Sequence, residues 1–262
     1  MDSRLRGNDN INREDNMKID AHSHLGGPDK GDGKSQSPEE ILRAMDAAGI
    51  DMAVVFPFNE AEPGVSFSRC NDFIADAARA HPDRLVGFCR LDPNFGERAV
   101  KELERCVKGL GLKGVKLHPS SQGFALDDPV LLEILAAAEG FGMPVVLDTG
   151  KKESPPSSVA TLAEMFQSLT IIMAHINLLE ESLKAASGHP NIYLGTTGYF
   201  NIKRLGEAVK TAGAHRFVSG SDSPYIKMER EVGKFDGIPG LSDQDKALIT
   251  GGNAASVLEL DN

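Results

Sequence analysis

The chain has 262 residues, 40% of them hydrophobic, which is enough for one large α/β domain with a sizeable core. Its formal net charge of −10 argues against nucleic acid or an anionic membrane surface as the main partner. Every apolar run is shorter than the roughly 20 residues that span a bilayer, and the N-terminus lacks the apolar segment of a secretory signal. Cys70, Cys89 and Cys106 lack CxxC spacing and fit reduced thiols, so we expect a cytoplasmic protein.

Residues 1–16 are polar and aperiodic, and we expect them to form a disordered extension before a folded domain at residues 17–262. Met17 is a candidate for the true start of translation. From this point, short apolar runs alternate with helical patterns. The runs are rich in β-branched residues and nearly continuous, as strands buried on both faces of a parallel sheet are. They lie at about 18–22, 51–57, 85–91, 113–118, 144–149, 170–175, 191–195 and 216–221.

Helix signals separate these predicted strands. Ser37 is suited to cap a helix that begins at Pro38, and a helical pattern from Glu97 ends before Gly111. Asp128 precedes Pro129 at the start of another helix, which ends near residue 140. Eight strands that alternate with helices over about 245 residues match a (β/α)₈ barrel, which is typically roughly 250 residues long. The sequence therefore predicts a single-domain barrel of the TIM type.

The seven histidines fall into two groups on this barrel. His22, His24, His118 and His175 lie at or near the carboxyl ends of predicted strands, where barrels of this type place their active sites. His22 and His24 are two residues apart, so both imidazoles lie on one face of a strand and form half of a metal site. The other three come just before predicted strands, at the opposite end, and belong to structural turns: His81, His189 and His215.

Charged residues occupy other strand ends. Asp222 follows the last predicted strand and can ligate a metal or accept a proton, although it can also cap the next helix. Lys116 and His118 share one face of their strand. A lysine inside a barrel needs an anion, which can be substrate, a neighbouring carboxylate or its own carbamate. Arg90 can bind a substrate carboxylate, or it can form a structural ion pair.

Taken together and in order, these motifs resemble the amidohydrolase superfamily, and more closely its amidohydrolase-related (amidohydrolase 2) branch. That branch includes aminocarboxymuconate-semialdehyde decarboxylase, several aromatic-acid decarboxylases and lactonases. The resemblance implies that His22, His24 and Asp222 bind one divalent metal, commonly zinc, and that His175 acts beside it with Asp222 in catalysis. It rests on segments 20–24, 114–119, 174–175, 220–224 and 252–255.

Asp148 departs from the pattern of the family. The resemblance implies a histidine ligand at the end of the fifth strand, but the run Val145-Val146-Leu147 is followed by an aspartate. Asp148 can still reach a metal, and an anionic oxygen donor favours Mn²⁺ more than an imidazole does. We therefore expect one divalent ion, with zinc as the first expectation and manganese as the alternative.

The sequence thus predicts a metal-dependent hydrolase that cleaves an amide, ester or lactone by a metal-activated water. One alternative is a metal-dependent, non-oxidative decarboxylase of an unsaturated or aromatic acid, with Arg90, Lys116 and His118 binding the substrate. Another is a non-catalytic barrel in which the aspartate at position 148 marks a degraded metal site used to bind a ligand. The expected partner is a small molecule, not nucleic acid or membrane, and a homo-oligomer is left open.

Overall fold

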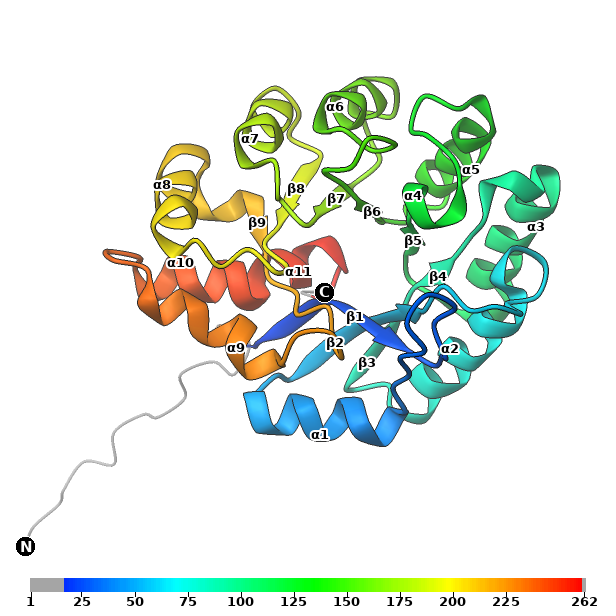
Figure 1. Cartoon of the computed structure of the whole chain (residues 1–262), viewed down its shortest axis with the longest axis horizontal. Coiled ribbons are helices and arrows are strands. Elements are labelled where there is room, and N and C mark those ends of the chain that lie inside the picture. Colours follow the sequence, from blue (N-terminus) through cyan, green and yellow to red (C-terminus); the bar gives the residue numbers. More distant parts are fainter. Residues whose placement is uncertain (1–16, 261–262) are drawn as a thin grey trace, which may run out of the picture.

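Parallel strands and helices alternate along the chain in the computed structural model, which describes residues 17–260 (Figure 1). The predicted disordered extension over residues 1–16 lies outside the described residues. The strands pair in the orders β1-β2-β3 and β4-β5-β6-β7-β8-β9, and each pairing is parallel. Their bounds are β1 (Ile19–Leu25), β2 (Met52–Pro57), β3 (Leu85–Gly87), β4 (Cys89–Arg90), β5 (Val115–Leu117), β6 (Val145–Asp148), β7 (Ile171–Ala174), β8 (Ile192–Gly195) and β9 (Phe217–Val218).

The two sets of strands join into one closed wall. β3 and β4 are parts of the single run predicted at 85–91, and Phe88 between them donates its backbone N–H to Val55 O at 2.9 Å. Cys89 then donates to Gly114 O at 2.9 Å, so the chain changes its pairing partner from β2 to β5 without leaving the wall. At the other seam, Ala21 N donates to Ser219 O at 2.9 Å. The predicted (β/α)₈ barrel is confirmed.

Helices surround the strands (Figure 1). The predicted caps are present: Ser37 forms a capping box on the first helix, and the Asp128 side chain accepts from Val130 N. The helices are α1 (Pro38–Ala48), α2 (Ser68–Ala80), α3 (Glu97–Arg105), α4 (Pro119–Gln122), α5 (Pro129–Gly140), α6 (Pro156–Met165), α7 (Leu179–Ser187), α8 (Ile202–Ala212), α9 (Met228–Gly233), α10 (Asp243–Ala247) and α11 (Asn253–Val257). Short π-helical turns (Cys106–Leu110, Leu248–Gly252) and 3₁₀ turns (Val65–Phe67, Pro93–Phe95, Ala214–Arg216, Lys234–Gly237) extend or connect them.

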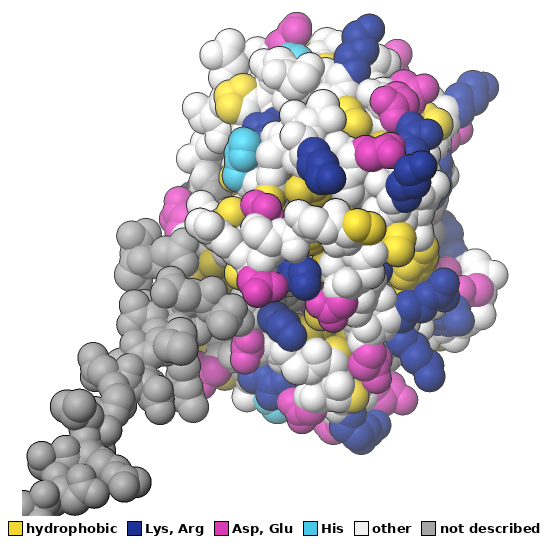
Figure 2. Space-filling model, turned by 90° about the vertical axis from the view of Figure 1, so that its left-hand side faces the viewer, with side chains coloured by type: hydrophobic (Ala, Val, Ile, Leu, Met, Phe, Trp, Pro, Cys, Tyr) yellow, Lys and Arg dark blue, Asp and Glu magenta, His cyan; other side chains and the backbone are white. Residues whose placement is uncertain are grey.

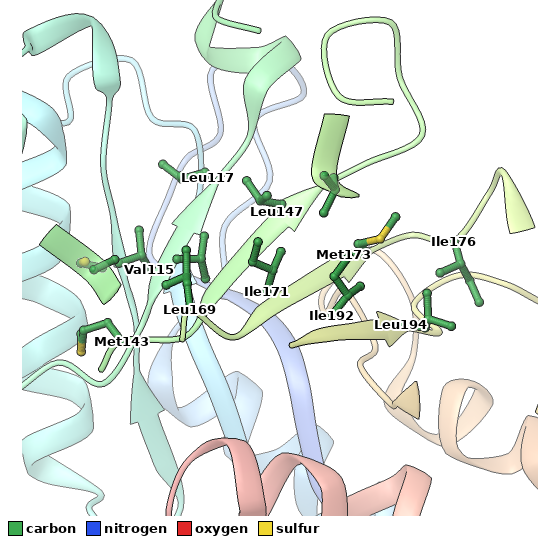
Figure 3. Close-up of a cluster of buried hydrophobic side chains, with 14 of the residues drawn as sticks. Val115, Leu117, Met143, Leu147, Leu169, Ile171, Met173, Ile176, Ile192 and Leu194 are labelled. Atoms are coloured by element: carbon green, nitrogen blue, oxygen red, sulfur yellow. The ribbon is translucent and has the colours of Figure 1, made fainter. Parts of the chain in front are cut away.

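Hydrophobic side chains form two layers on either side of the strands. The outer layer lies between strands and helices, and Figure 3 shows part of it, including Leu147, Ile171 and Met173. The inner layer fills the barrel below the site, with Phe56 and Ile172 among its buried members. Each fully buried side chain of this size contributes roughly 1.5–3 kcal/mol. The packed interior therefore fixes the strand ends, which is where a barrel carries its functional residues.

The surface and helices also bear on the expected partners. On the face seen in Figure 2, Lys and Arg side chains are interspersed with Asp and Glu rather than gathered into one basic area. Within residues 17–260, no helix has the length and apolar character needed to cross a membrane.

Candidate active site

A β-bulge in β1 carries the two histidines of the motif. Asp20 pairs with Ala53, and Ser23 pairs with Val55, so three steps along β1 match two steps along β2. A bulge bends the strand and redirects its side chains. His22 and His24 both line one cavity, and their ring centroids are 5.8 Å apart.

Asp222 meets both imidazoles. Its Oδ1 lies 3.4 Å from His22 Nε2 and 3.2 Å from His24 Nε2. Burial opposes ionisation of Asp222, but the hydrogen bonds from the two histidines outweigh it and hold its pKa well below the usual range. Asp222 and His175 both have a φ of 60°, in the left-handed region that residues other than glycine rarely adopt. Such a backbone costs on the order of 1–3 kcal/mol per residue and is concentrated at functional sites.

The donor set fits a divalent metal. His22, His175 and Asp222 each offer one ligand atom, and these atoms all lie within 4.8 Å of one another. His24 is beside them, and its Nδ1 lies 3.4 Å from Pro57 O. With its proton on Nδ1, donated to this carbonyl, His24 would offer Nε2 to a metal instead of donating it to Asp222. Burial lowers the pKa of His22, His24 and His175, which keeps the imidazoles neutral, as metal ligation requires.

Asp148 lies in a second cluster next to the metal group. Its Oδ2 is 3.3 Å from His118 Nε2 and 3.5 Å from His175 Nε2, and its Oδ1 is 2.9 Å from Lys151 Nζ. Burial opposes its ionisation, but the positive charge of Lys116 and the other neighbours hold the pKa of Asp148 below its usual range. The three-residue metal group does not include Asp148. Its predicted role as a metal ligand therefore stays a prediction.

Two buried cations line the same cavity. Arg90 is 1% exposed and donates to Ser121 Oγ at 2.9 Å and to Pro57 O at 3.3 Å. Lys116 is also 1% exposed, and its Nζ lies 3.4 Å from His22 Nε2. Burial lowers the pKa of Arg90 to about 10 and that of Lys116 to about 8. Among residues 17–260, neither cation has a carboxylate within ion-pair distance. Both are therefore available to an anionic ligand.

The cavity has a volume of about 560 Å³ and opens at the carboxyl ends of the strands. The structure brings every predicted site residue to its lining: His22, His24, Arg90, Lys116, His118, Asp148, His175 and Asp222. Sequence reasoning missed other residues of the lining, among them Asn59, Lys151 and Tyr225. These three lie two, three and seven residues after β2, β6 and β9, in the loops where the rule that strand ends carry the site could have found them.

The three histidines outside the cavity lie between a helix and the next strand, as predicted. His81 follows α2, and His215 lies in the turn before β9. His189 Nδ1 is 2.6 Å from Ala185 O, a contact that secures the end of α7.

Curated proteins that are similar to this chain include decarboxylases. Gamma-resorcylate decarboxylase from Polaromonas sp. is 24% identical over an alignment of 282 positions, gaps included, which covers 84% of this chain and 86% of that protein. The 2-amino-3-carboxymuconate-6-semialdehyde decarboxylase of Dictyostelium discoideum is 27% identical over an alignment of 235 positions, which covers 73% of this chain and 66% of that protein.

Solved structures support the fold. The 2,6-dihydroxybenzoate decarboxylase from Rhizobium superposes with a TM-score of 0.76 at 19% identity, covering 94% of this chain and 100% of that one. Dihydroxybenzoic acid decarboxylase from Polaromonas sp. JS666, which contains bound manganese, gives a TM-score of 0.72 at 21% identity, covering 94% and 98%. The family model described as amidohydrolase (Amidohydro_2) matches residues 19–260. Over almost its entire described length, therefore, this chain is a member of the amidohydrolase family, in its amidohydrolase 2 branch.

Proposed function

We propose that this protein is a metal-dependent, non-oxidative decarboxylase of a small aromatic or unsaturated carboxylic acid. The observation that carries the proposal is the pair of buried, unpaired cations, Arg90 and Lys116, in the cavity that also holds the metal group. Relatives that are named decarboxylases support the same reaction. The comparisons thus favour the decarboxylase alternative over hydrolysis, which was the first expectation from the sequence.

The metal is assigned to His22, His24 and Asp222, with His175 in the same group. Two or three neutral imidazoles and a carboxylate suit either Zn²⁺ or Mn²⁺. A bound divalent ion supplies positive charge that holds a substrate oxygen and stabilises negative charge as it develops. Asp148 is proposed as an additional ligand, since its Oδ2 lies 3.5 Å from His175 Nε2 and is close to the metal group.

The protein side chains would bind the acid and carry its proton. Arg90 and Lys116 hold the carboxylate, because neither has an anionic partner among the described residues. In the reaction, the bond between the substrate carbon and its carboxylate carbon breaks, and the electron pair remains on the substrate carbon. That carbon takes one proton and CO₂ leaves. His175, at its imidazole, and Asp222, at the carboxylate oxygen that does not face the metal group, are the groups proposed to carry this proton.

Buried aromatic rings pack against the histidines of the cavity, and Tyr225 lines the cavity itself. The Phe58 ring stacks on His24 with centroids 4.9 Å apart, and the Phe56 ring meets His22 edge-on at 4.9 Å. Tyr225 lies at the rim, 5.7 Å from His24. Such rings exclude water and strengthen electrostatic contacts inside the cavity. His118 also lines the cavity, its Nδ1 accepts from Ser121 N at 3.3 Å, and it is proposed to contact the substrate as well.

The test is a decarboxylation assay in D₂O. Protein loaded with Mn²⁺ or Zn²⁺ is incubated with 2,6-dihydroxybenzoate, 5-carboxyvanillate and related acids, and CO₂ release is measured together with deuterium on the product carbon. The proposal expects both signals from at least one acid, and neither signal from protein treated with chelator. Hydrolysis of lactones or esters in H₂¹⁸O, with ¹⁸O in the product acid and no CO₂ from any acid, would overturn it in favour of a hydrolase. No metal uptake and no turnover would favour the non-catalytic barrel.

A further inference from the structure

Two segments from opposite ends of the chain meet at one seam of the barrel and carry the proposed metal ligands. β1 supplies His22 and His24, and the segment after β9 supplies Asp222. Backbone hydrogen bonds join the segments: Asp222 N donates to His22 O at 2.7 Å, and His24 N donates to Ser223 O at 2.8 Å. The relative position of these segments therefore determines the distance between the ligand atoms.

Asp20 links the same two segments through its side chain. Its Oδ1 accepts from His22 N at 2.9 Å and from Ser221 N at 3.0 Å. His22 is itself a proposed metal ligand, and Ser221 directly precedes the proposed ligand Asp222. Asp20 is 3% exposed and lies at the start of the bulge, where the regular pairing of β1 is interrupted. A side-chain oxygen here acts as a hydrogen-bond acceptor at the interruption.

The seam is tightly packed at this point. A Cβ atom placed on Gly220 would lie 2.5 Å from His22 Cβ and 2.9 Å from His22 N, distances that real side chains do not adopt. The two segments are thus in direct contact beside the oxygen of Asp20. Asp222, two residues further on, has its left-handed φ of 60° and needs such restraint to keep it.

We propose that Asp20 is a positioning residue for the metal: one carboxylate oxygen, by accepting from His22 N and Ser221 N together, sets the spacing of the His22 and Asp222 ligand atoms. The proposal rests on the metal site of the proposed function, but not on the decarboxylation itself. Two other roles are possible for a buried aspartate. It can link two segments without affecting the metal, or its negative charge can attract the ion at a distance.

Two substitutions separate these roles. Asp20→Asn keeps a carbonyl oxygen that can accept both N–H groups but removes the negative charge. Asp20→Ala removes the acceptor. Loss of a group that orients metal ligands typically lowers metal affinity about 10–100-fold. Asp51→Ala is the matched control, because Asp51 Oδ2 also accepts a backbone N–H, that of Lys18 at 2.8 Å, directly before β1 and outside the proposed ligand segments.

The measurement is Mn²⁺ binding to the full-length chain, by calorimetry and electron paramagnetic resonance, well below the unfolding temperature. We expect the Kd for Mn²⁺ to rise about 10–100-fold in Asp20→Ala, with an altered spectrum, and to stay near the wild-type value in Asp20→Asn and Asp51→Ala. If folded Asp20→Ala binds Mn²⁺ with the wild-type affinity, Asp20 only links the two segments and does not position the metal ligands. Equal losses in Asp20→Asn and Asp20→Ala would show that charge, not spacing, is what matters. Either result overturns the proposal.

A variant that folds is needed for this comparison. If Asp20→Ala does not fold, Asp20→Glu replaces it, because glutamate keeps the charge and displaces the oxygen by one methylene group. The proposal then expects weaker Mn²⁺ binding and an altered spectrum in Asp20→Glu, and a spectrum unchanged from wild type overturns it. If the wild-type protein binds no Mn²⁺, the proposed metal site itself is refuted. That result is distinct from a failure to decarboxylate any acid, which would leave the role of Asp20 standing.

Discussion

Replacing Lys116 by methionine is expected to stabilise the metal-free protein and to weaken its binding of acids. Lys116 is 1% exposed, and burial lowers its pKa from 10.5 to about 8 in the folded chain. The charged form is therefore less favourable in the folded state than in the unfolded state. This difference amounts to about 3 kcal/mol at pH 7, and it already includes the attraction of Asp148. Methionine has a similar length and no charge, so the variant avoids this cost.

The stability difference between Lys116→Met and the wild type is expected to depend on pH. Between pH 8 and 10.5 the unfolded chain binds more protons at Lys116 than the folded chain does, so the wild type gains stability relative to the variant as the pH rises. The advantage of Lys116→Met should thus be fully present below pH 8 and fall to about 1 kcal/mol at pH 10. Urea unfolding of both proteins with chelator present, at pH 7 and at pH 10, measures both values.

Lys151→Met is the matched control. Lys151 pairs with the same carboxylate, Asp148, at 2.9 Å, but its side chain is 45% exposed. Because its ammonium remains in water, the same substitution should bring no gain in stability. A Lys116→Met protein that is no more stable than the wild type at pH 7, or whose advantage does not shrink at pH 10, would refute the reasoning. It would show that Asp148 compensates the buried charge fully.

Three further predictions concern the metal and the proton. His22→Ala and His24→Ala should each lose most of the bound metal while circular dichroism stays unchanged, and full metal content in both by elemental analysis would remove them as ligands. Asp222→Asn should lower turnover by several orders of magnitude with little change in substrate affinity, and a rate above about a tenth of wild type would exclude Asp222 as the proton carrier. Asp148→His should shift selectivity from Mn²⁺ toward Zn²⁺ in competition binding, whereas an unchanged ratio would place Asp148 outside the metal shell.

Strand positions could be predicted well because buried parallel strands are continuous apolar runs, but their pairing could not. The run at 85–91 reads as one strand, yet its pairing changes at Phe88, from β2 to β5. The run at 216–221 forms only a two-residue strand, Phe217–Val218, and its remainder joins β1 by separate hydrogen bonds. In both runs, the pairing depends on which neighbouring segment lies beside each backbone group once the barrel is closed. The local sequence pattern does not specify that neighbour.

The part of the candidate site that lies at the carboxyl ends of strands could be predicted from the sequence. His22, His118, His175 and Asp222 all follow from the strand-end rule, since side chains at carboxyl ends of parallel strands converge. The ion-pair partner of Asp148 could not be predicted from this rule. The sequence allowed Lys116 a neighbouring carboxylate as its partner, whereas the ammonium that pairs with Asp148 is that of Lys151, three residues further along a loop. Loop conformation decides that contact, and residue type alone does not specify it.

The charge of the cavity is compatible with the proposed acid substrate, although the whole protein is acidic. The whole chain carries a formal charge of −10, which repels anions at long range. Among the described residues of the cavity, however, cationic side chains outnumber carboxylates even before a divalent ion is added. Salt screens the long-range term within about 10 Å, while buried charges are screened much less. Under the proposed function, recognition of the acid therefore depends on the local cations and not on the net charge of the chain; these cations are Lys30, Arg90, Lys116 and Lys151.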